Sequence, residues 1–177
     1  MKKFNTNYDF EKSHIYLNSV NKYLLDEVNN GNLNAFVTLT SNKQMKIDDF
    51  LLTLNNCFEQ TRNHCFNFKN YQNKKNKEVC ENFYYYGAIE LGSYDGNTHV
   101  HLLMHIDTNN PIRLSQVENY FKKRWIKFIP NGDYDFQIIG ENQIHDSNAL
   151  VSYINKTLIK NNDSYSKSIH NNGFIFN

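Results

Sequence analysis

Two strand-like runs separated by a short turn segment constrain this chain more than any other feature, because together they have the pattern of a β-hairpin. Residues 83–91 are rich in aromatic and β-branched side chains, and residues 97–106 form a second strand-like segment of similar length. The segment between them contains Asp95-Gly96, a favoured pair at the tip of a hairpin. The sequence therefore predicts two antiparallel strands joined by a turn centred on this pair.

Three potential metal ligands lie on these two strands. Alternate side chains of a strand share a face, so His99 and His101 are expected to project to the same side. With the turn centred as above, Glu90 is expected opposite His101 and beside His99. Two imidazoles and a carboxylate suit Mn²⁺, Zn²⁺ or Fe²⁺ and tolerate Mg²⁺. The alternative is a pair of half-exposed strand histidines that bind no metal, and His105, further along the same face, is expected to be a supporting or structural histidine.

The order of predicted elements indicates an α+β fold. Helical and strand periodicities alternate along the chain in the order helix, β-α-β-β-α-β, helix. This is the split βαβ pattern of ferredoxin-like and RRM-like domains, with a central antiparallel sheet, helices on one face and the active site on the other. The expected elements are helices over residues 13–28, 47–63, 115–127 and 146–160, with strands over 34–40, 83–91, 97–106 and 134–140.

Length and composition favour a single domain without a membrane segment. The 177 residues fit one domain, with residues 1–32 as an N-terminal helical extension, 33–160 as the core and 161–177 as a polar tail. The chain lacks an apolar run of membrane-spanning length and begins without a signal-peptide pattern, so we expect a cytoplasmic protein. Its three cysteines show no CxxC spacing, and its net charge of +1 gives no global signal for nucleic-acid binding.

The last predicted helix carries a tyrosine outside its apolar stripe. Tyr153, Lys156 and Lys160 lie three, four and seven positions apart on another face. A phenol with an ordinary pKa near 10 is a poor nucleophile at neutral pH, and Lys156, one turn on, is a cation that would assist it or hold a phosphate. The chain has twelve tyrosines, so a packing role is the alternative, and Tyr165 is the rival nucleophile.

These motifs, in this order, resemble the HUH endonucleases, and in particular the single-tyrosine replication initiators known as Rep proteins. The resemblance covers roughly residues 35 to 160. Residues 35–40, Ala-Phe-Val-Thr-Leu-Thr, look like the first initiator motif, and Glu90 precedes His99 by nine residues as a carboxylate does in many members. His99-Val100-His101 is similar to the histidine, hydrophobic, histidine motif, and Tyr153-Ile154-Asn155-Lys156 is similar to the tyrosine motif. Thr157 occupies the position at which two-tyrosine members have their second tyrosine, which favours a one-tyrosine enzyme.

The resemblance implies a metal-dependent DNA endonuclease and strand transferase. Such an enzyme nicks and rejoins single-stranded DNA at an origin or stem-loop through a 5′-phosphotyrosine intermediate and supports rolling-circle replication of a plasmid or phage. Glu90, His99 and His101 would bind Mn²⁺ or Mg²⁺, Tyr153 would be the nucleophile with Lys156 beside it, and a separate host helicase would unwind the duplex. DNA contacts are expected from threonines of the first strand and from basic residues of two helices: Thr38, Thr40, Lys122, Lys123, Arg124 and Lys160.

Three other functions remain open from the sequence. A single-tyrosine transposase carries a similar histidine pair followed by leucines, as in His101-Leu102-Leu103. A split βαβ sheet with exposed aromatic side chains also describes non-catalytic modules that bind single-stranded nucleic acid. A site of two histidines and one carboxylate is also able to activate water in a metal-dependent hydrolase.

Overall fold

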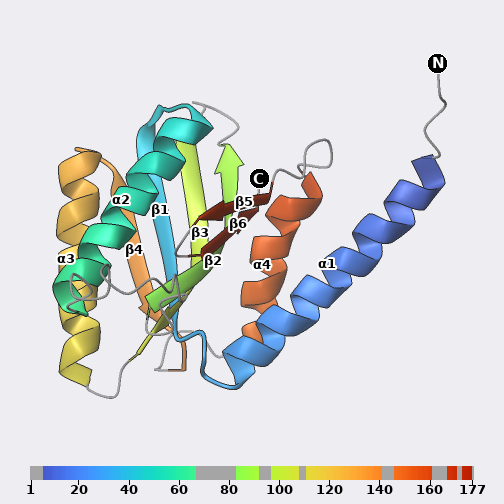
Figure 1. The fold of residues 1–177 in the computed structure, drawn as a ribbon, viewed down its shortest axis with the longest axis horizontal. Helices are drawn as coiled ribbons and strands as arrows, with labels where there is room; N and C mark the ends of the chain where they lie inside the picture. The colour runs from blue at the N-terminus through green and yellow to red at the C-terminus, as the bar shows by residue number, and fades with distance from the viewer. Residues whose placement is uncertain are drawn as a thin grey trace, which may run out of the picture.

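A computed structural model gives the fold of the chain (Figure 1) and describes residues 6–66, 83–91, 97–107, 111–140, 146–160, 167–170 and 173–176. The helices and strands follow one another in the predicted order, and two short strands are added near the C-terminus. In chain order they are α1 (Thr6–Asn29), β1 (Ala35–Gln44), α2 (Ile47–Cys65), β2 (Phe83–Leu91), β3 (Asn97–Ile106), α3 (Pro111–Phe128), β4 (Asp133–Ile138), α4 (Ser147–Lys160), β5 (Lys167–His170) and β6 (Gly173–Phe176).

The strands form one six-stranded sheet in the order β4-β1-β3-β2-β6-β5. The four central strands, β4, β1, β3 and β2, are antiparallel to their neighbours, which confirms the predicted α+β class with an antiparallel sheet. β6 pairs with β2 in parallel, and β5 pairs with β6 antiparallel. Part of the segment predicted as a polar tail therefore joins the sheet, where its backbone pairs with the edge of β2 that would otherwise be open.

Helices α2 and α3 cover one face of the sheet, where the larger hydrophobic core lies. Alternate residues of β1 and β3, such as Val37 and Leu102, point into this core and are fully buried. Trp125 of α3 packs edge-on against Phe50 of α2, and its indole N–H donates to the carbonyl oxygen of Asp133, 3.1 Å away. The helices of the β-α-β-β-α-β unit thus lie on a single face, as predicted.

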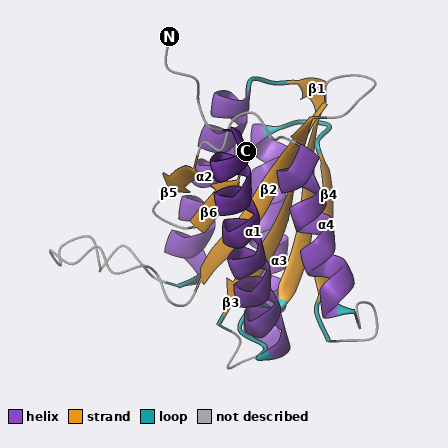
Figure 2. Ribbon diagram, turned by 90° about the vertical axis from the view of Figure 1, so that its right-hand side faces the viewer, coloured by secondary structure: helices purple, strands orange, loops and turns teal. Residues whose placement is uncertain are grey.

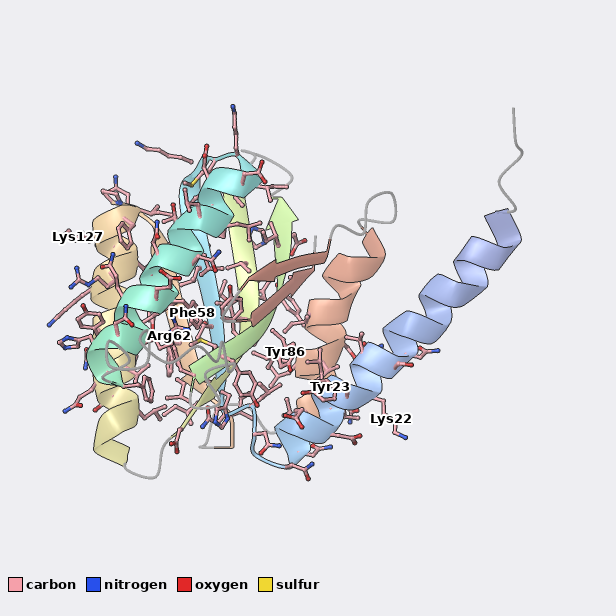
Figure 3. The ribbon with its side chains drawn as sticks, in the orientation of Figure 1. Lys22, Tyr23, Phe58, Arg62, Tyr86 and Lys127 are labelled. Carbon is pink, nitrogen blue, oxygen red and sulfur yellow. The ribbon has the colours of Figure 1, made fainter. Side chains whose placement is uncertain are left out.

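Helices α1 and α4 cover part of the opposite face, which differs from the expectation that this face is free of helices. Figure 2 shows both helices in front of the sheet. Their apolar stripes pack on Phe36, Ala88 and Leu103, because the sheet is apolar here on both sides and needs a second covering layer. The Tyr23 hydroxyl of α1 and the Tyr86 hydroxyl of β2 point toward one another and are hydrogen-bonded at 2.9 Å (Figure 3). The helical residues of this second core are Leu24, Val28, Leu150, Val151 and Ile154.

Several element ends differ from the predictions. The hairpin strands begin and end where they were predicted, but α3 begins at Pro111 and not at residue 115. Proline is well tolerated in the first turn of a helix, where its missing N–H has no partner in any case. Asp146 caps α4, since its Oδ1 accepts hydrogen bonds from the backbone N–H groups of Asn148 and Ala149 at 3.0 and 3.1 Å. Within the described residues, we find no helix whose length and apolarity would allow it to cross a membrane.

Candidate metal centre

The register of the β2–β3 hairpin places the three predicted ligands on one face but corrects their pairing. Glu90 lies directly opposite His99, and Ala88 lies opposite His101. The predicted pairing of Glu90 with His101 is therefore wrong by two residues. A shift of two residues leaves every side chain on its original face, so the three ligands still converge.

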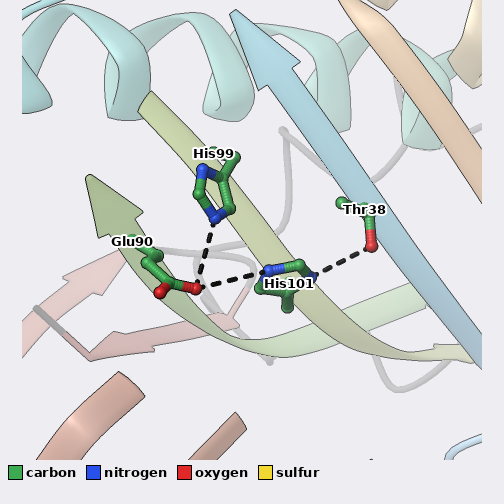
Figure 4. Close-up of polar contacts among 4 residues, drawn as sticks. All are labelled: Thr38, Glu90, His99 and His101. Carbon is green, nitrogen blue, oxygen red and sulfur yellow. Dashed lines mark hydrogen bonds and ion pairs between the residues drawn. The ribbon is translucent and has the colours of Figure 1, made fainter. Parts of the chain in front are cut away.

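The ligand atoms of Glu90, His99 and His101 all lie within 4.8 Å of one another. Glu90 Oε2 is 3.2 Å from His99 Nε2 and 3.9 Å from His101 Nε2 (Figure 4). Two atoms bound to one ion at about 2.1 Å are separated by about 3 to 4.2 Å, depending on the angle between the bonds. Both distances fall in this range, so Glu90 is spaced from each histidine as two ligands of one divalent cation would be.

His101 is the buried member of the group. Its side chain is 6% exposed, and burial, followed by the nearby His99, lowers its pKa to about 4, although Glu90 acts in the opposite direction. The ring is therefore neutral at pH 7, as a metal-binding imidazole must be. His101 Nε2 faces the carboxylate, and within the described part of the chain this buried atom has no hydrogen-bond partner. A buried polar atom without a partner is unfavourable, and a cation beside Glu90 and His99 would satisfy it.

The other side of the His101 ring is held by β1. Its Nδ1 atom lies 3.0 Å from Thr38 Oγ1, and Phe36 stacks on the ring with an angle of 5° between the planes. Both contacts arise because Phe36, Thr38 and Thr40 alternate along β1 and share the face of the histidines. Thr38 and Thr40 were predicted from the sequence to contact DNA. Phe36 was not among the predicted site residues, although the same alternation along β1 places it on this face.

Tyr153, the predicted nucleophile, lies beside His101. Its ring meets the His101 ring edge-on at a centroid distance of 4.7 Å and an angle of 87°. It also meets Phe36 edge-on at 6.4 Å. Tyr153 is 47% exposed, so a substrate from solvent has access to it. The side chains of Lys156 and Lys160 lie outside the described part of α4, so their predicted roles stay predictions.

The predicted basic DNA contacts of α3 are not near this group. Val117, Phe121 and Trp125 pack α3 into the core on the opposite face of the sheet from the histidines. Lys122 and Lys123 are exposed on that helix, and the Arg124 guanidinium donates to the Tyr120 hydroxyl at 2.5 Å. Figure 3 shows Lys127 of the same helix pointing away from the sheet. The structure therefore separates the basic surface of α3 from the candidate metal centre.

His105 is not one of the three clustered side chains. His105 Nδ1 is hydrogen-bonded to the backbone carbonyl oxygen of Asn32, and its ring stacks on Tyr84, which fits the structural role expected for it. The rival nucleophile Tyr165 lies outside the described residues. Asp133 and Asp135 of β4 were not singled out in the sequence, although they pair with Thr40 and Thr38 and extend the same face toward the sheet edge.

Comparison of the chain with protein-family models, curated proteins and solved structures gives no match.

Proposed function

We propose that this protein is an HUH-type, single-tyrosine DNA endonuclease that nicks and rejoins single-stranded DNA as the replication initiator of a rolling-circle element. One observation supports this more than any other. The exposed ring of Tyr153 lies against His101, which is itself one of three side chains whose potential ligand atoms lie within 4.8 Å of one another. A tyrosine beside a cation site would suit phosphoryl transfer to a side chain, because the cation would stabilise charge on the phosphate that the phenol attacks.

The fold is compatible with this function. The strand order β4-β1-β3-β2, with α2 and α3 on one face, supports assigning the central unit to the ferredoxin-like or RRM-like split βαβ class. The face that carries the histidines is only partly covered by helices. It offers a surface on which a single strand would lie across β3 and β1 near Tyr153.

The chemistry follows from the groups around the site. Glu90, His99 and His101 would hold Mn²⁺ or Mg²⁺, and the bound cation would stabilise negative charge on the scissile phosphate. The Tyr153 phenolic oxygen attacks phosphorus, the bond from phosphorus to the 3′-oxygen breaks, and the DNA 5′-phosphate becomes attached to the tyrosine. The phenol loses its proton, and the departing 3′-oxygen gains one. A phosphodiester replaces a phosphodiester, so the reverse attack by a 3′-hydroxyl rejoins the strand.

The proposed substrate is single-stranded DNA at an origin or stem-loop, in the cytoplasm. Tyr153, which lies on α4 against the sheet face, needs the backbone of an accessible strand, whereas a duplex first has to be opened. We therefore propose that a separate helicase unwinds the duplex. The region from residue 33 to residue 160 would act as one catalytic unit.

The test is the formation of a covalent protein–DNA adduct. A pool of single-stranded and stem-loop oligonucleotides is incubated with the protein and Mn²⁺, and the products are separated under denaturing conditions. Oligonucleotides labelled at the 3′ end should give labelled protein, because the tyrosine retains the 5′-phosphate of that fragment. Oligonucleotides labelled at the 5′ end should give only a shortened free fragment. The Tyr153→Phe variant should give neither product.

Tyr23→Phe is the matched control, because Tyr23 is 46% exposed and also lies on the helical layer that covers this face. This variant should form the adduct as the unaltered protein does. Cleavage without a labelled protein band would instead indicate a nuclease that uses water. Binding without any cleavage, unchanged in Tyr153→Phe, would indicate a non-catalytic binding module.

A further inference from the structure

The Thr38 hydroxyl contacts the ring of His101, which is the buried one of the three candidate metal ligands Glu90, His99 and His101. Thr38 lies directly opposite His101 in the antiparallel pairing of β1 with β3, and its Oγ1 is 3.0 Å from His101 Nδ1 (Figure 4). The second ring nitrogen, Nε2, points the other way, toward Glu90 Oε2 at 3.9 Å. The two nitrogens of His101 thus face two different groups, one on each side of the ring.

A neutral imidazole has one N–H donor and one lone pair, and its neighbours decide which nitrogen carries which. A proton on Nε2 would be a buried donor without an acceptor, because the nearest carboxylate oxygen, Glu90 Oε2, is 3.9 Å away and too far for a hydrogen bond. A proton on Nδ1 would be donated to Thr38 Oγ1 at normal hydrogen-bond length. The second arrangement satisfies the donor and leaves the Nε2 lone pair directed at the site of the other two ligands.

We infer that Thr38 is a positioning residue for the candidate metal centre: its hydroxyl oxygen accepts the Nδ1 proton of His101 and so holds the imidazole in the tautomer that can ligate through Nε2. The inference rests on the metal site of the proposed function. It gives Thr38 a role different from direct contact with DNA. Hydrogen-bond partners of this kind fix both the tautomer and the orientation of metal-binding histidines.

The surroundings of the ring support a fixed orientation. The Phe36 ring lies nearly parallel to His101 with centroids 6.0 Å apart, and Tyr153 meets His101 edge-on at 4.7 Å, so aromatic rings border the imidazole on two sides. Thr38 is β-branched and has few side-chain rotamers on a strand, which keeps its hydroxyl in place. Because Thr38 is only two residues from Phe36, one segment of β1 supplies both the hydrogen bond and the stacking contact.

Thr40 provides a matched control. It lies on the same strand and the same face, but opposite His99, whose Nε2 is already 3.2 Å from Glu90. Replacing either threonine with valine removes one hydroxyl and preserves side-chain shape and β-propensity. The two substitutions therefore differ in whether the hydroxyl that contacts His101 is lost.

The first measurement is the tautomer of His101 in metal-free protein. Long-range proton–nitrogen NMR spectra of ¹⁵N-histidine-labelled protein distinguish protonated from unprotonated ring nitrogens, and comparison with a His101→Asn variant assigns the signals. The unaltered protein, Thr38→Ser and Thr40→Val should carry the proton on Nδ1. Thr38→Val should shift it wholly or partly to Nε2. An Nε2 proton in the unaltered protein, or no change in Thr38→Val, would overturn the inference.

The second measurement is Mn²⁺ affinity by titration calorimetry on the same four proteins. Thr38→Val should weaken binding by about 10- to 100-fold, the range typical of such supporting partners, while Thr38→Ser and Thr40→Val should stay within about 3-fold. Tight binding in the unaltered protein with an unchanged Kd in Thr38→Val would overturn the positioning role alone. Failure of the unaltered protein to bind Mn²⁺ would overturn the metal site of the proposed function, and the positioning role with it.

Discussion

The ring of Tyr153, on α4, packs edge-on against the ring of His101, on β3, with centroids 4.7 Å apart. This contact joins a helix near the end of the chain to the central hairpin and so brings the ring of Tyr153 beside one of the candidate metal ligands. It depends on the packing of α4, because Ile154 is fully buried in the second core beside Phe36. The position of the Tyr153 ring is therefore set by the packing of Ile154 in the core as well as by the contacts of the ring itself.

Two substitutions of Tyr153 distinguish the contribution of its ring to packing from the contribution of its hydroxyl to adduct formation. Tyr153→Phe keeps the ring, so we expect Mn²⁺ affinity within about 2-fold of the unaltered protein and no covalent adduct. Tyr153→Ala also removes the edge-on contact, and an aromatic contact of this kind is worth about 0.5–1.5 kcal/mol beyond the area that it buries. Urea unfolding of both variants, beside Mn²⁺ titration, measures the difference. Equal adduct formation in Tyr153→Phe would eliminate this residue as the nucleophile.

His101→Ala should abolish Mn²⁺ binding, because it removes the buried ligand of the three. His105→Ala is the natural comparison, since His105 lies on the same strand and face but is hydrogen-bonded to the Asn32 carbonyl oxygen. We expect His105→Ala to bind Mn²⁺ with nearly unchanged affinity. Calorimetric titration of both variants tests this, and unimpaired binding in His101→Ala would contradict the ligand assignment.

Mn²⁺ should stabilise the folded protein, and EDTA should reverse the effect. A ligand that binds only the folded state adds about 2.7 kcal/mol to the free energy of unfolding at 100 times its Kd. Glu90→Gln keeps the shape of the side chain but removes its negative charge, so the same Mn²⁺ concentration should stabilise this variant far less. Urea unfolding with and without Mn²⁺ gives both values. Equal stabilisation of Glu90→Gln would show that Mn²⁺ binds elsewhere.

Ile154→Ala should loosen α4 and move Tyr153 away from His101. Ile154 is fully buried, and truncation of such a side chain costs about 2–5 kcal/mol of stability. We expect adduct formation to fall even at temperatures where the variant stays folded by circular dichroism. Ser152→Ala changes an exposed residue of the same helix and should leave adduct formation intact. Unchanged adduct formation by Ile154→Ala would show that the packing of α4 is not needed to position Tyr153 for the reaction.

Gly87→Ala should disturb the hairpin that carries the ligands. A Cβ atom at this position would lie 2.5 Å from Leu102 Cδ2 and 2.9 Å from the His101 carbonyl oxygen, so β2 would have to move away from β3. We expect a loss of about 1–3 kcal/mol in stability, together with weaker Mn²⁺ binding. Gly31→Ala is a useful contrast, because Gly31 has open space around it but a φ of +74°. That variant should lose about 1 kcal/mol and keep its Mn²⁺ affinity.

Much of the hairpin was predictable, because a period of two residues assigns every side chain to a face. That pattern correctly placed Glu90, His99 and His101 together and gave the bounds of both strands. It gave the wrong partner for Glu90, because a shift of two residues preserves all faces and the conformation of the turn sets the register. Hydrophobic alternation alone therefore cannot determine which ligand lies opposite which.

The sequence by itself determined the order of the elements, the shared face of the three ligands and the apolar stripe that keeps Tyr153 on the outer side of its helix. Only the tertiary structure decided that Tyr153 meets His101, that Thr38 contacts His101 Nδ1 and that Lys122 lies on the opposite face of the sheet. The reason is physical. Faces and stripes follow from local backbone periodicity, whereas contacts between distant segments depend on how complete side-chain surfaces pack when helices and strands assemble.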